Sequence, residues 1–129
     1  MIAVDTNILV RYFVGAEDDD TRKATRFVEQ DLSIDQLGYV TSVAICEVIW
    51  VIKNYYKFGY AAQAAVIRLM LDASQLLVEH EDCVASALES QHGDIADAII
   101  HFVGVKQGCS KTLTFDKKFA RLSGVELLQ

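Results

Sequence analysis

The chain has 129 residues, 52% of them hydrophobic and none of them proline, with a formal net charge of −6 and a sequence pI near 4.9. This size and apolar content predict one compact domain, residues 1–129, with enough material for a core. The acidic balance excludes a strongly basic, non-specific nucleic-acid binder, because affinity for backbone phosphates comes from Lys and Arg.

Short β-rich runs alternate with helical patterns along the chain. Strands are expected at residues 2–5, near residue 39, at 76–80 and at 111–115, with the closing VELL segment as a candidate edge strand. Helices are expected at about 7–13, 20–30, 42–57, 60–72, 82–91 and 94–107, and a short last helix opens at 116 and stops near 124. The alternation predicts an α/β fold with a parallel sheet and helices on both faces.

The apolar runs are too short to cross a membrane. The run 43–52 is about half of the roughly 20 residues that a membrane span needs, and no basic segment precedes an apolar one at the N-terminus. We therefore expect a cytoplasmic protein without a membrane partner.

Four acidic residues stand at or near predicted helix starts, within apolar stretches: Asp5, Glu47, Asp97 and Asp116. Asp5 is the only charge in MIAVDTNILV, and Glu47 is the only charge in VAICEVIWVI. An ionised carboxylate in buried apolar surroundings must be paired, hydrogen-bonded, metal-bound or neutralised. We expect the four carboxylates to be buried and to share a cation.

The predicted layout brings these acids to one end of a sheet. Asp5 ends the first strand and Asp116 follows the fourth, while Glu47 and Asp97 lie in the early turns of helices. Ligands of open α/β sheets gather beyond the carboxyl ends of the strands. Oxygen ligands without His or Cys at ligand spacing suit Mg²⁺ or Mn²⁺ rather than Zn²⁺, and a bound cation would make the acidic pocket attractive to phosphate.

Four segments in this order resemble the PIN-domain ribonucleases, and in particular the toxin component of VapBC-type toxin–antitoxin pairs: AVDTNILVRY, SVAICEVIWVI, GDIADAII and TLTFDKKF. The resemblance covers essentially the whole chain. It implies a three-layer α/β/α sandwich with a central parallel sheet of about five strands, Mg²⁺ or Mn²⁺ as cofactor, and endonucleolytic cleavage of RNA. A cognate antitoxin is the implied protein partner, and we also expect a homodimer.

The resemblance and the residue types together assign roles to the acids. Asp5 and Asp97 are the expected principal metal ligands, and Asp116 is a third or water-mediated ligand. Glu47 is a ligand or the base that orients the attacking water. Five polar residues are expected to support the site: Thr6 and Asn7 by positioning the Asp5 carboxylate or contacting phosphate, Ser42 and Thr114 by hydrogen-bonding the acids, and Asp94 beside Asp97.

Simpler roles compete with these assignments. Asp94 and Asp97 have the spacing of an N-cap and its N3 partner, and capping is the favoured role of Asp94 but not of Asp97. Asp116 is equally well placed to cap a helix. His101, one turn after Asp97, is interpreted as a core or supporting histidine rather than a metal ligand.

Two other functions remain open on the sequence. One is a PIN-fold module that binds RNA or protein without useful catalysis. The other is a different Mg²⁺-dependent phosphate-handling α/β domain, such as a receiver domain or a haloacid-dehalogenase-like phosphatase, although the acids do not follow the spacing of either. Basic residues such as Arg11 are candidates for meeting the RNA backbone, and Tyr55 and Tyr56 for stacking on bases or on a partner, against the simpler roles of a solvated face and core packing.

Overall fold

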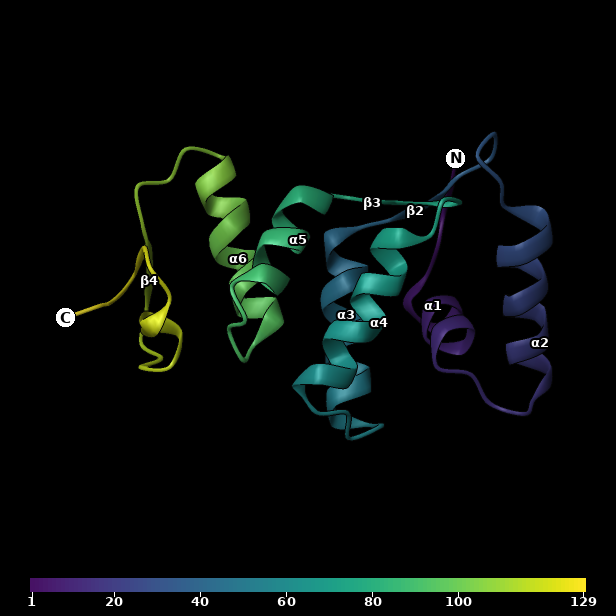
Figure 1. The fold of residues 1–129 in the computed structure, drawn as a ribbon, viewed down its shortest axis with the longest axis horizontal. Helices are drawn as coiled ribbons and strands as arrows, with labels where there is room; N and C mark the ends of the chain where they lie inside the picture. The colour runs from purple at the N-terminus through teal and green to yellow at the C-terminus, as the bar shows by residue number, and fades with distance from the viewer. The chain divides into compact units, whose positions relative to one another are not determined.

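The structure is a computed structural model that describes all 129 residues of the chain, in two compact units, Met1–Glu79 and His80–Gln129. Figure 1 labels their helices and several of their strands. All strand pairs in both units are parallel, apart from one isolated antiparallel bridge between Ser33 and Gln36. The predicted α/β class with parallel strand pairing is confirmed. No helix has the length and apolar character needed to span a bilayer.

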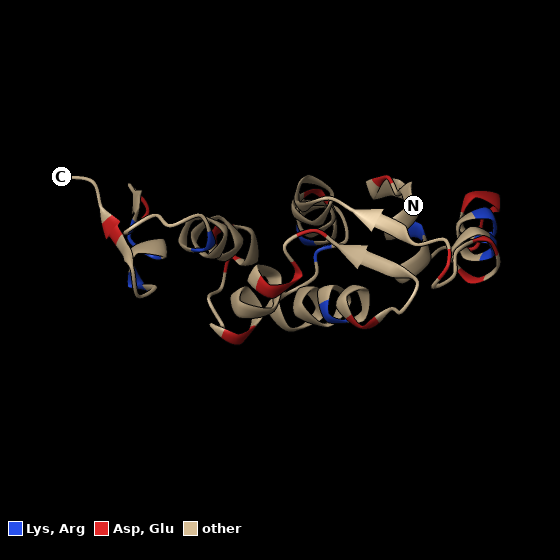
Figure 2. Ribbon diagram, turned by 90° about the horizontal axis from the view of Figure 1, so that it is seen from above, with Lys and Arg blue, Asp and Glu red and all other residues tan.

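The first unit holds three strands in the order β1-β2-β3: β1 (Ile2–Ala3), β2 (Gly38–Val40) and β3 (Leu76–Val78). Its helices are α1 (Thr6–Phe13), α2 (Asp19–Arg26), α3 (Ser42–Asn54) and α4 (Tyr60–Asp72), and a π-helical turn, η1 (Phe27–Asp31), continues α2. Each strand is connected to the next through helices, as parallel pairing requires. Figure 2 shows helices on both sides of this sheet.

The middle strand β2 has no room for a side chain at Gly38. A Cβ atom there would lie 2.7 Å from Leu32 Cδ1, 2.9 Å from Val4 Cγ2 and 3.0 Å from Leu76 Cδ2. All three neighbours belong to the buried core. Glycine at this position lets the β2 backbone approach the core side chains closely.

Helix α3 begins as predicted and ends earlier than predicted. Thr41 is its N-cap, and the Thr41 hydroxyl accepts a hydrogen bond of 3.0 Å from the backbone N–H of Ala44. The helix ends at Asn54 rather than near Lys57. The left-handed backbone after it belongs to Lys57, with φ of 60°, and Gly59 instead precedes α4 as its N-cap.

The second unit contains two helices and two strands: α5 (Glu81–Glu89), α6 (Ile95–Lys106), β4 (Thr112–Thr114) and β5 (Val125–Leu127). The strands pair in parallel, with Thr112 opposite Val125. The predicted last helix is only a single 3₁₀ turn, η2 (Phe119–Arg121), because the chain becomes extended again at Leu122.

Candidate functional site

Asp5 stands at the start of α1 without capping it. It occupies the N-cap position with an extended backbone, yet its exposed carboxylate accepts no capping hydrogen bond. By contrast, Asp18, Thr41 and Asp94 each accept a backbone N–H at the start of their helices. The Asp5 carboxylate is therefore not consumed by the helix that it precedes, which leaves its oxygens available to a ligand.

The next residue, Thr6, joins α1 to the second acid of this unit. The buried Thr6 hydroxyl donates a hydrogen bond of 3.2 Å to Glu47 Oε1 on α3. Thr6, predicted to position the Asp5 carboxylate or contact phosphate, thus holds the other acid instead. Thr6 thus follows Asp5 in the chain and binds Glu47 through its hydroxyl.

The expectation that the four acids are buried is wrong. Asp5, Glu47 and Asp116 are exposed, and Asp97 is half-buried. The error arose from the apolar run around Glu47, whose buried residues form only one stripe of α3: Ala44, Ile45, Val48, Ile49 and Ile52. Apolar residues outside that stripe, such as Val43 and Trp50, are 70% and 65% exposed. Apolar neighbours in sequence therefore do not guarantee burial on a helix.

Ser42 does not bind the predicted acids through its side chain. Its backbone N–H donates to Glu79 Oε1 at 2.8 Å, while its hydroxyl oxygen is buried with no hydrogen-bond partner. Glu79 Oε2 also accepts a hydrogen bond of 3.2 Å from the Tyr39 hydroxyl. Burial, and then the hydrogen bond to Glu79, raises the pKa of the Tyr39 hydroxyl.

Glu79 is the acid that sequence reasoning did not place at the site. It directly follows β3 and fixes the start of α3, since one carboxylate holds both the Ser42 N–H and the Tyr39 hydroxyl. The available signal was an acid directly after a short apolar strand, which is the same signal that marks Asp5.

In the second unit, Asp94 and Asp97 are linked through the backbone. Asp94 is the N-cap of α6, and its Oδ1 atom accepts a hydrogen bond of 2.9 Å from the Asp97 N–H. This confirms the capping role predicted for Asp94. The same bond fixes the backbone of half-buried Asp97 in the first turn of α6, so Asp94 positions Asp97.

Asp116 and Thr114 form a local turn. The Thr114 hydroxyl accepts the Asp116 N–H at 3.0 Å, and Asp116 Oδ1 accepts the N–H groups of Lys118 and Phe119 at 2.8 and 3.3 Å. Thr114 therefore supports the backbone of Asp116 rather than its carboxylate. One carboxylate oxygen of Asp116 caps the turn into η2, the simpler of the two predicted roles.

His101 is a core histidine, as predicted. It is 4% exposed, and its Nδ1 atom lies 2.8 Å from the Thr112 hydroxyl on β4. Gly124 closes over the ring: its φ is +90°, and a Cβ atom there would lie 2.8 Å from His101 Cε1. This packing explains both the burial of the imidazole and the need for glycine at position 124.

The donor atoms of the acids fit a hard divalent cation. Asp5 and Glu47 offer carboxylate oxygens, and the partner of Glu47 is the hydroxyl oxygen of Thr6, so the donor set is all oxygen. Neither unit by itself gathers three His, Cys, Asp or Glu side chains in a group that could hold a metal ion. By position in the chain, Asp5 and Glu47 belong to the first unit, and Asp97 and Asp116 to the second.

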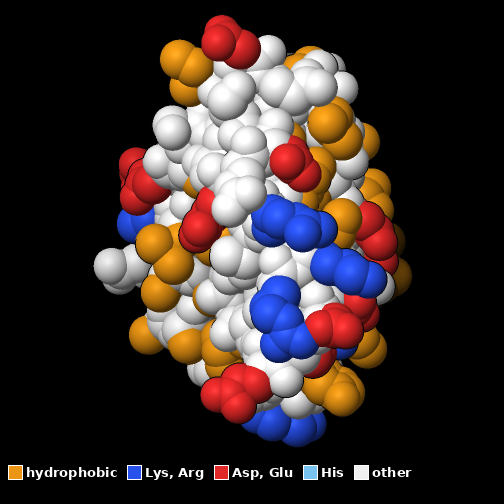
Figure 3. Space-filling view, turned by 90° about the vertical axis from the view of Figure 1, so that its right-hand side faces the viewer, with side chains coloured by type: hydrophobic (Ala, Val, Ile, Leu, Met, Phe, Trp, Pro, Cys, Tyr) orange, Lys and Arg blue, Asp and Glu red, His pale blue; other side chains and the backbone are white.

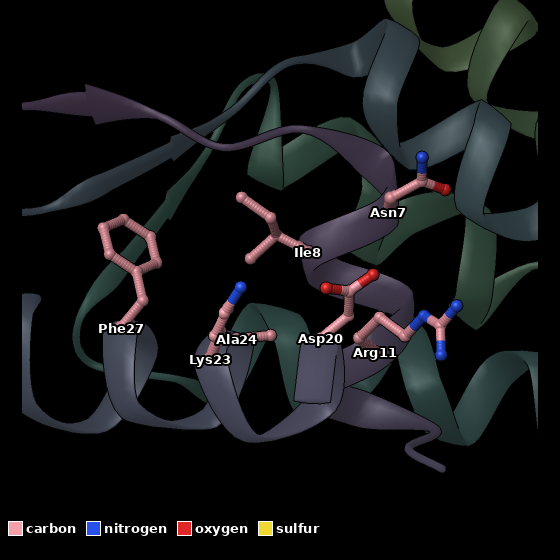
Figure 4. Close-up of a pocket in the computed structure, with 7 residues that line it drawn as sticks. All are labelled: Asn7, Ile8, Arg11, Asp20, Lys23, Ala24 and Phe27. Carbon is pink, nitrogen blue, oxygen red and sulfur yellow. The ribbon is translucent and has the colours of Figure 1, made fainter. Parts of the chain in front are cut away.

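Two hollows flank α1 in the first unit. Figure 4 shows the larger, of about 460 Å³, whose labelled side chains come from α1, α2 and η1: Asn7, Ile8, Arg11, Asp20, Lys23, Ala24 and Phe27. The smaller, of about 280 Å³, is lined by Asn7, Val10, Arg11, Val51, Tyr55 and Tyr56. Asn7 and Arg11 line both hollows. Figure 3 shows Lys and Arg side chains gathered with acids on one face, and α2 contributes such residues of both signs, among them Lys23 and Asp20.

Comparison with family models matches residues 2–125 to the PIN domain, so the match runs through both units. PIN domains are generally metal-dependent nucleases that use divalent ions such as Mg²⁺. A search among curated proteins finds no match.

Proposed function

Because the chain belongs to the PIN-domain family, we propose that it is a Mg²⁺- or Mn²⁺-dependent endoribonuclease and the toxin of a VapBC-type toxin–antitoxin pair. The observation that carries the proposal is the state of Asp5. Its carboxylate stands at a helix start without capping it, beside a threonine that holds a second acid, Glu47. This is the arrangement expected of a ligand rather than of a structural cap.

The proposal gives each acid a role in phosphodiester hydrolysis. Asp5, Asp97 and Asp116 would hold the cation, which when bound lowers the pKa of a coordinated water and polarises a phosphoryl oxygen. Thr6 fixes Glu47 through Oε1, so that Oε2 is oriented to bind the cation or accept a proton from water. Asp94 would act on Asp97 only indirectly, through the backbone hydrogen bond that fixes the first turn of α6.

Cleavage of total RNA by the purified protein tests the activity. We expect cleavage with Mg²⁺ or Mn²⁺ and none in excess EDTA, with activity restored when the metal is added back. Equal cleavage in EDTA would contradict the metal mechanism. RNA binding without cleavage under all metal conditions would favour the alternative, a PIN-fold binding module without catalysis.

The toxin role adds a protein partner. The exposed carboxylates of Asp5 and Glu47 would attract an Arg or Lys of an antitoxin, because charge-assisted hydrogen bonds to carboxylates are strong. We further propose that the protein is cytoplasmic and forms a homodimer. Expression of the protein alone should slow growth, and co-expression of the cognate antitoxin should relieve it. Harmless expression of soluble wild-type protein at high level would contradict the toxin role.

A further inference from the structure

The smaller of the two hollows lies between α1 and the C-terminal end of α3. Its volume of about 280 Å³ is sufficient for a planar ring system, and its lining combines two phenol rings, one guanidinium, one amide and two valines. Tyr55 is 77% exposed, and its ring contacts that of Tyr56 edge to face, with centroids 5.3 Å apart. One aromatic face is thus presented to solvent at the mouth of a hollow.

The hollow continues the line of the Thr6–Glu47 contact. On α1, Val10 lies four residues after Thr6 on the same face, and Arg11 lies four residues after Asn7. On α3, Val51 lies four residues after Glu47, and Tyr55 four residues after Val51. Eight residues of helix span about 12 Å. A chain bound at Glu47 would therefore reach the hollow after about two helical turns.

Arg11 is held in place and keeps donors for a ligand. Its Nη1 atom is paired with Asp18, and the side chain is about one third exposed. A guanidinium has five N–H donors and stays charged at all working pH values, so one ion pair does not exhaust it. An oriented cation beside an exposed aromatic ring is the combination that binds the phosphate and the base of an unpaired nucleotide.

We propose that this hollow binds one unpaired nucleotide of the RNA substrate, with the base stacked on Tyr55, the phosphate on Arg11, and Asn7 bonded to the base edge or ribose. The inference rests on the proposed function, because it takes RNA as the substrate. The lining favours a nucleotide over a protein segment: its only aliphatic side chains are Val10 and Val51, whereas its rings and guanidinium match a base and a phosphate. The site selects single-stranded RNA, since a paired base cannot be turned into the hollow.

Binding of a labelled single-stranded RNA oligonucleotide, followed by fluorescence anisotropy, tests the site. The Asp5→Asn background prevents cleavage during the measurement. In this background Tyr55→Leu should weaken binding about tenfold, as expected for loss of one stacked base, whereas Tyr55→Phe should bind like the parent. Trp50→Leu, which removes an exposed aromatic side chain of the same helix outside the hollow, is the matched control and should have no effect.

The charge is tested in the same assay. Arg11→Gln should weaken binding and reduce its salt dependence, because one phosphate contact is lost. Arg22→Gln is the control, since Arg22 is also paired with an aspartate but does not line the hollow. A duplex RNA should compete poorly against the labelled single strand. Removal of the stacked base from the oligonucleotide should abolish the difference between Tyr55→Leu and its parent.

Three results would overturn the inference: unchanged binding by Tyr55→Leu, an equal loss in Trp50→Leu, or a Tyr55→Leu defect confined to binding of an antitoxin. Cleavage assays separate this failure from failure of the proposed function. If the protein with Asp5 intact cleaves RNA and Tyr55→Leu changes neither KM nor binding, the hollow is not a nucleotide site but the nuclease stands. If Tyr55→Leu weakens binding and no cleavage occurs, the nucleotide site stands and the nuclease does not.

Discussion

Asp5 in the first unit and Asp94 in the second both occupy N-cap positions, but the two carboxylates are used in opposite ways. In the first, Asp5 precedes α1 and accepts no capping bond, while Thr6 holds Glu47. In the second, Asp94 caps α6 through the Asp97 N–H, and Asp116 accepts two backbone N–H groups. An acid at a helix start is therefore not by itself a sign of function. What distinguishes Asp5 from Asp94 is whether the neighbouring backbone uses the carboxylate.

The largest expected difference between these acids is in catalysis. Asp5→Asn and Asp97→Asn should each lower RNA cleavage about 100-fold or more, because each removes a ligand charge at almost constant volume, and even residues that only support metal ligands commonly contribute 10- to 100-fold. The measurement is the initial rate of RNA cleavage at saturating Mg²⁺, with circular dichroism to verify folding.

Asp94→Asn is the matched control for this comparison. Asparagine caps a helix about as well as aspartate, so the Asp97 backbone should stay in place and most of the activity should remain. If Asp5→Asn retains full activity, or if Asp94→Asn loses as much as Asp97→Asn, the division between ligands and caps is wrong.

Metal binding should stabilise the folded protein. A cation that binds only the folded state at one hundred times its Kd contributes about 2.7 kcal/mol, which raises Tm by several degrees for a domain of this size. Differential scanning calorimetry should show this shift with Mn²⁺ or Mg²⁺ and not with Na⁺ at matched ionic strength. Asp5→Asn should respond much less. A full metal response in that variant would show that Asp5 is not a ligand.

Removing the carboxylates of Asp94 and Asp5 should change the free energy of unfolding by different amounts. Asp94→Ala should lower the free energy of unfolding by about 1 kcal/mol, because the first turn of α6 loses the acceptor of its Asp97 N–H. Asp5→Ala should change stability much less, since its carboxylate caps nothing. Urea denaturation of the metal-free variants measures both values, and equal losses would remove the distinction between the two aspartates.

The smallest expected effect concerns two surface ion pairs. The hydrogen bond from Lys106 chiefly lowers the pKa of Asp82, whereas hydrogen bonds from Thr21 chiefly lower that of Asp18, with Arg11 contributing less. A carboxyl whose folded pKa is depressed stabilises the protein above its unfolded pKa, and this stability is lost as pH falls through the folded pKa. Lys106 has a raised pKa, so its contribution is lost only as pH rises through that value.

Carboxyl titration by NMR checks this prediction. Lys106→Gln should raise the pKa of Asp82 most of the way back to its ordinary value. Arg11→Gln should leave the pKa of Asp18 almost as low as in the wild type. A larger rise of the Asp18 pKa in Arg11→Gln than of the Asp82 pKa in Lys106→Gln would mean that the ion pair, and not the capping hydrogen bond, sets the pKa of Asp18.

The order of elements could be read from the sequence because the boundary signals are local. Thr41 and Asp94 mark helix starts through their own side chains, and short apolar runs mark the strands. The end of α3 was misjudged because a non-glycine residue, Lys57, adopts the left-handed conformation expected of Gly59. Sequence propensities do not reveal such a substitution.

The candidate site was predictable in its residue types and not in its contacts. The Thr6–Glu47 bond joins residues 41 positions apart and depends on how α1 packs beside α3, which no local pattern encodes. The exposure of Glu47 depends on which stripe of α3 faces the core. Glu79 was overlooked as a support for the same reason: its two partners, Tyr39 and Ser42, lie on another strand and at the start of another helix.

The close packing around Gly38 limits which substitutions this sequence can accept. Any other residue there adds a Cβ atom within 3.0 Å of Leu32, Val4 and Leu76 at once, and overpacking of a core typically costs about 1–3 kcal/mol. Any single substitution of Gly38 is therefore expected to lower the stability of the protein, whichever residue replaces glycine. A larger residue at position 38 becomes tolerable only after a neighbouring side chain, such as that of Leu32, has been replaced by a smaller one. Gly38 and its neighbours are therefore expected to vary together.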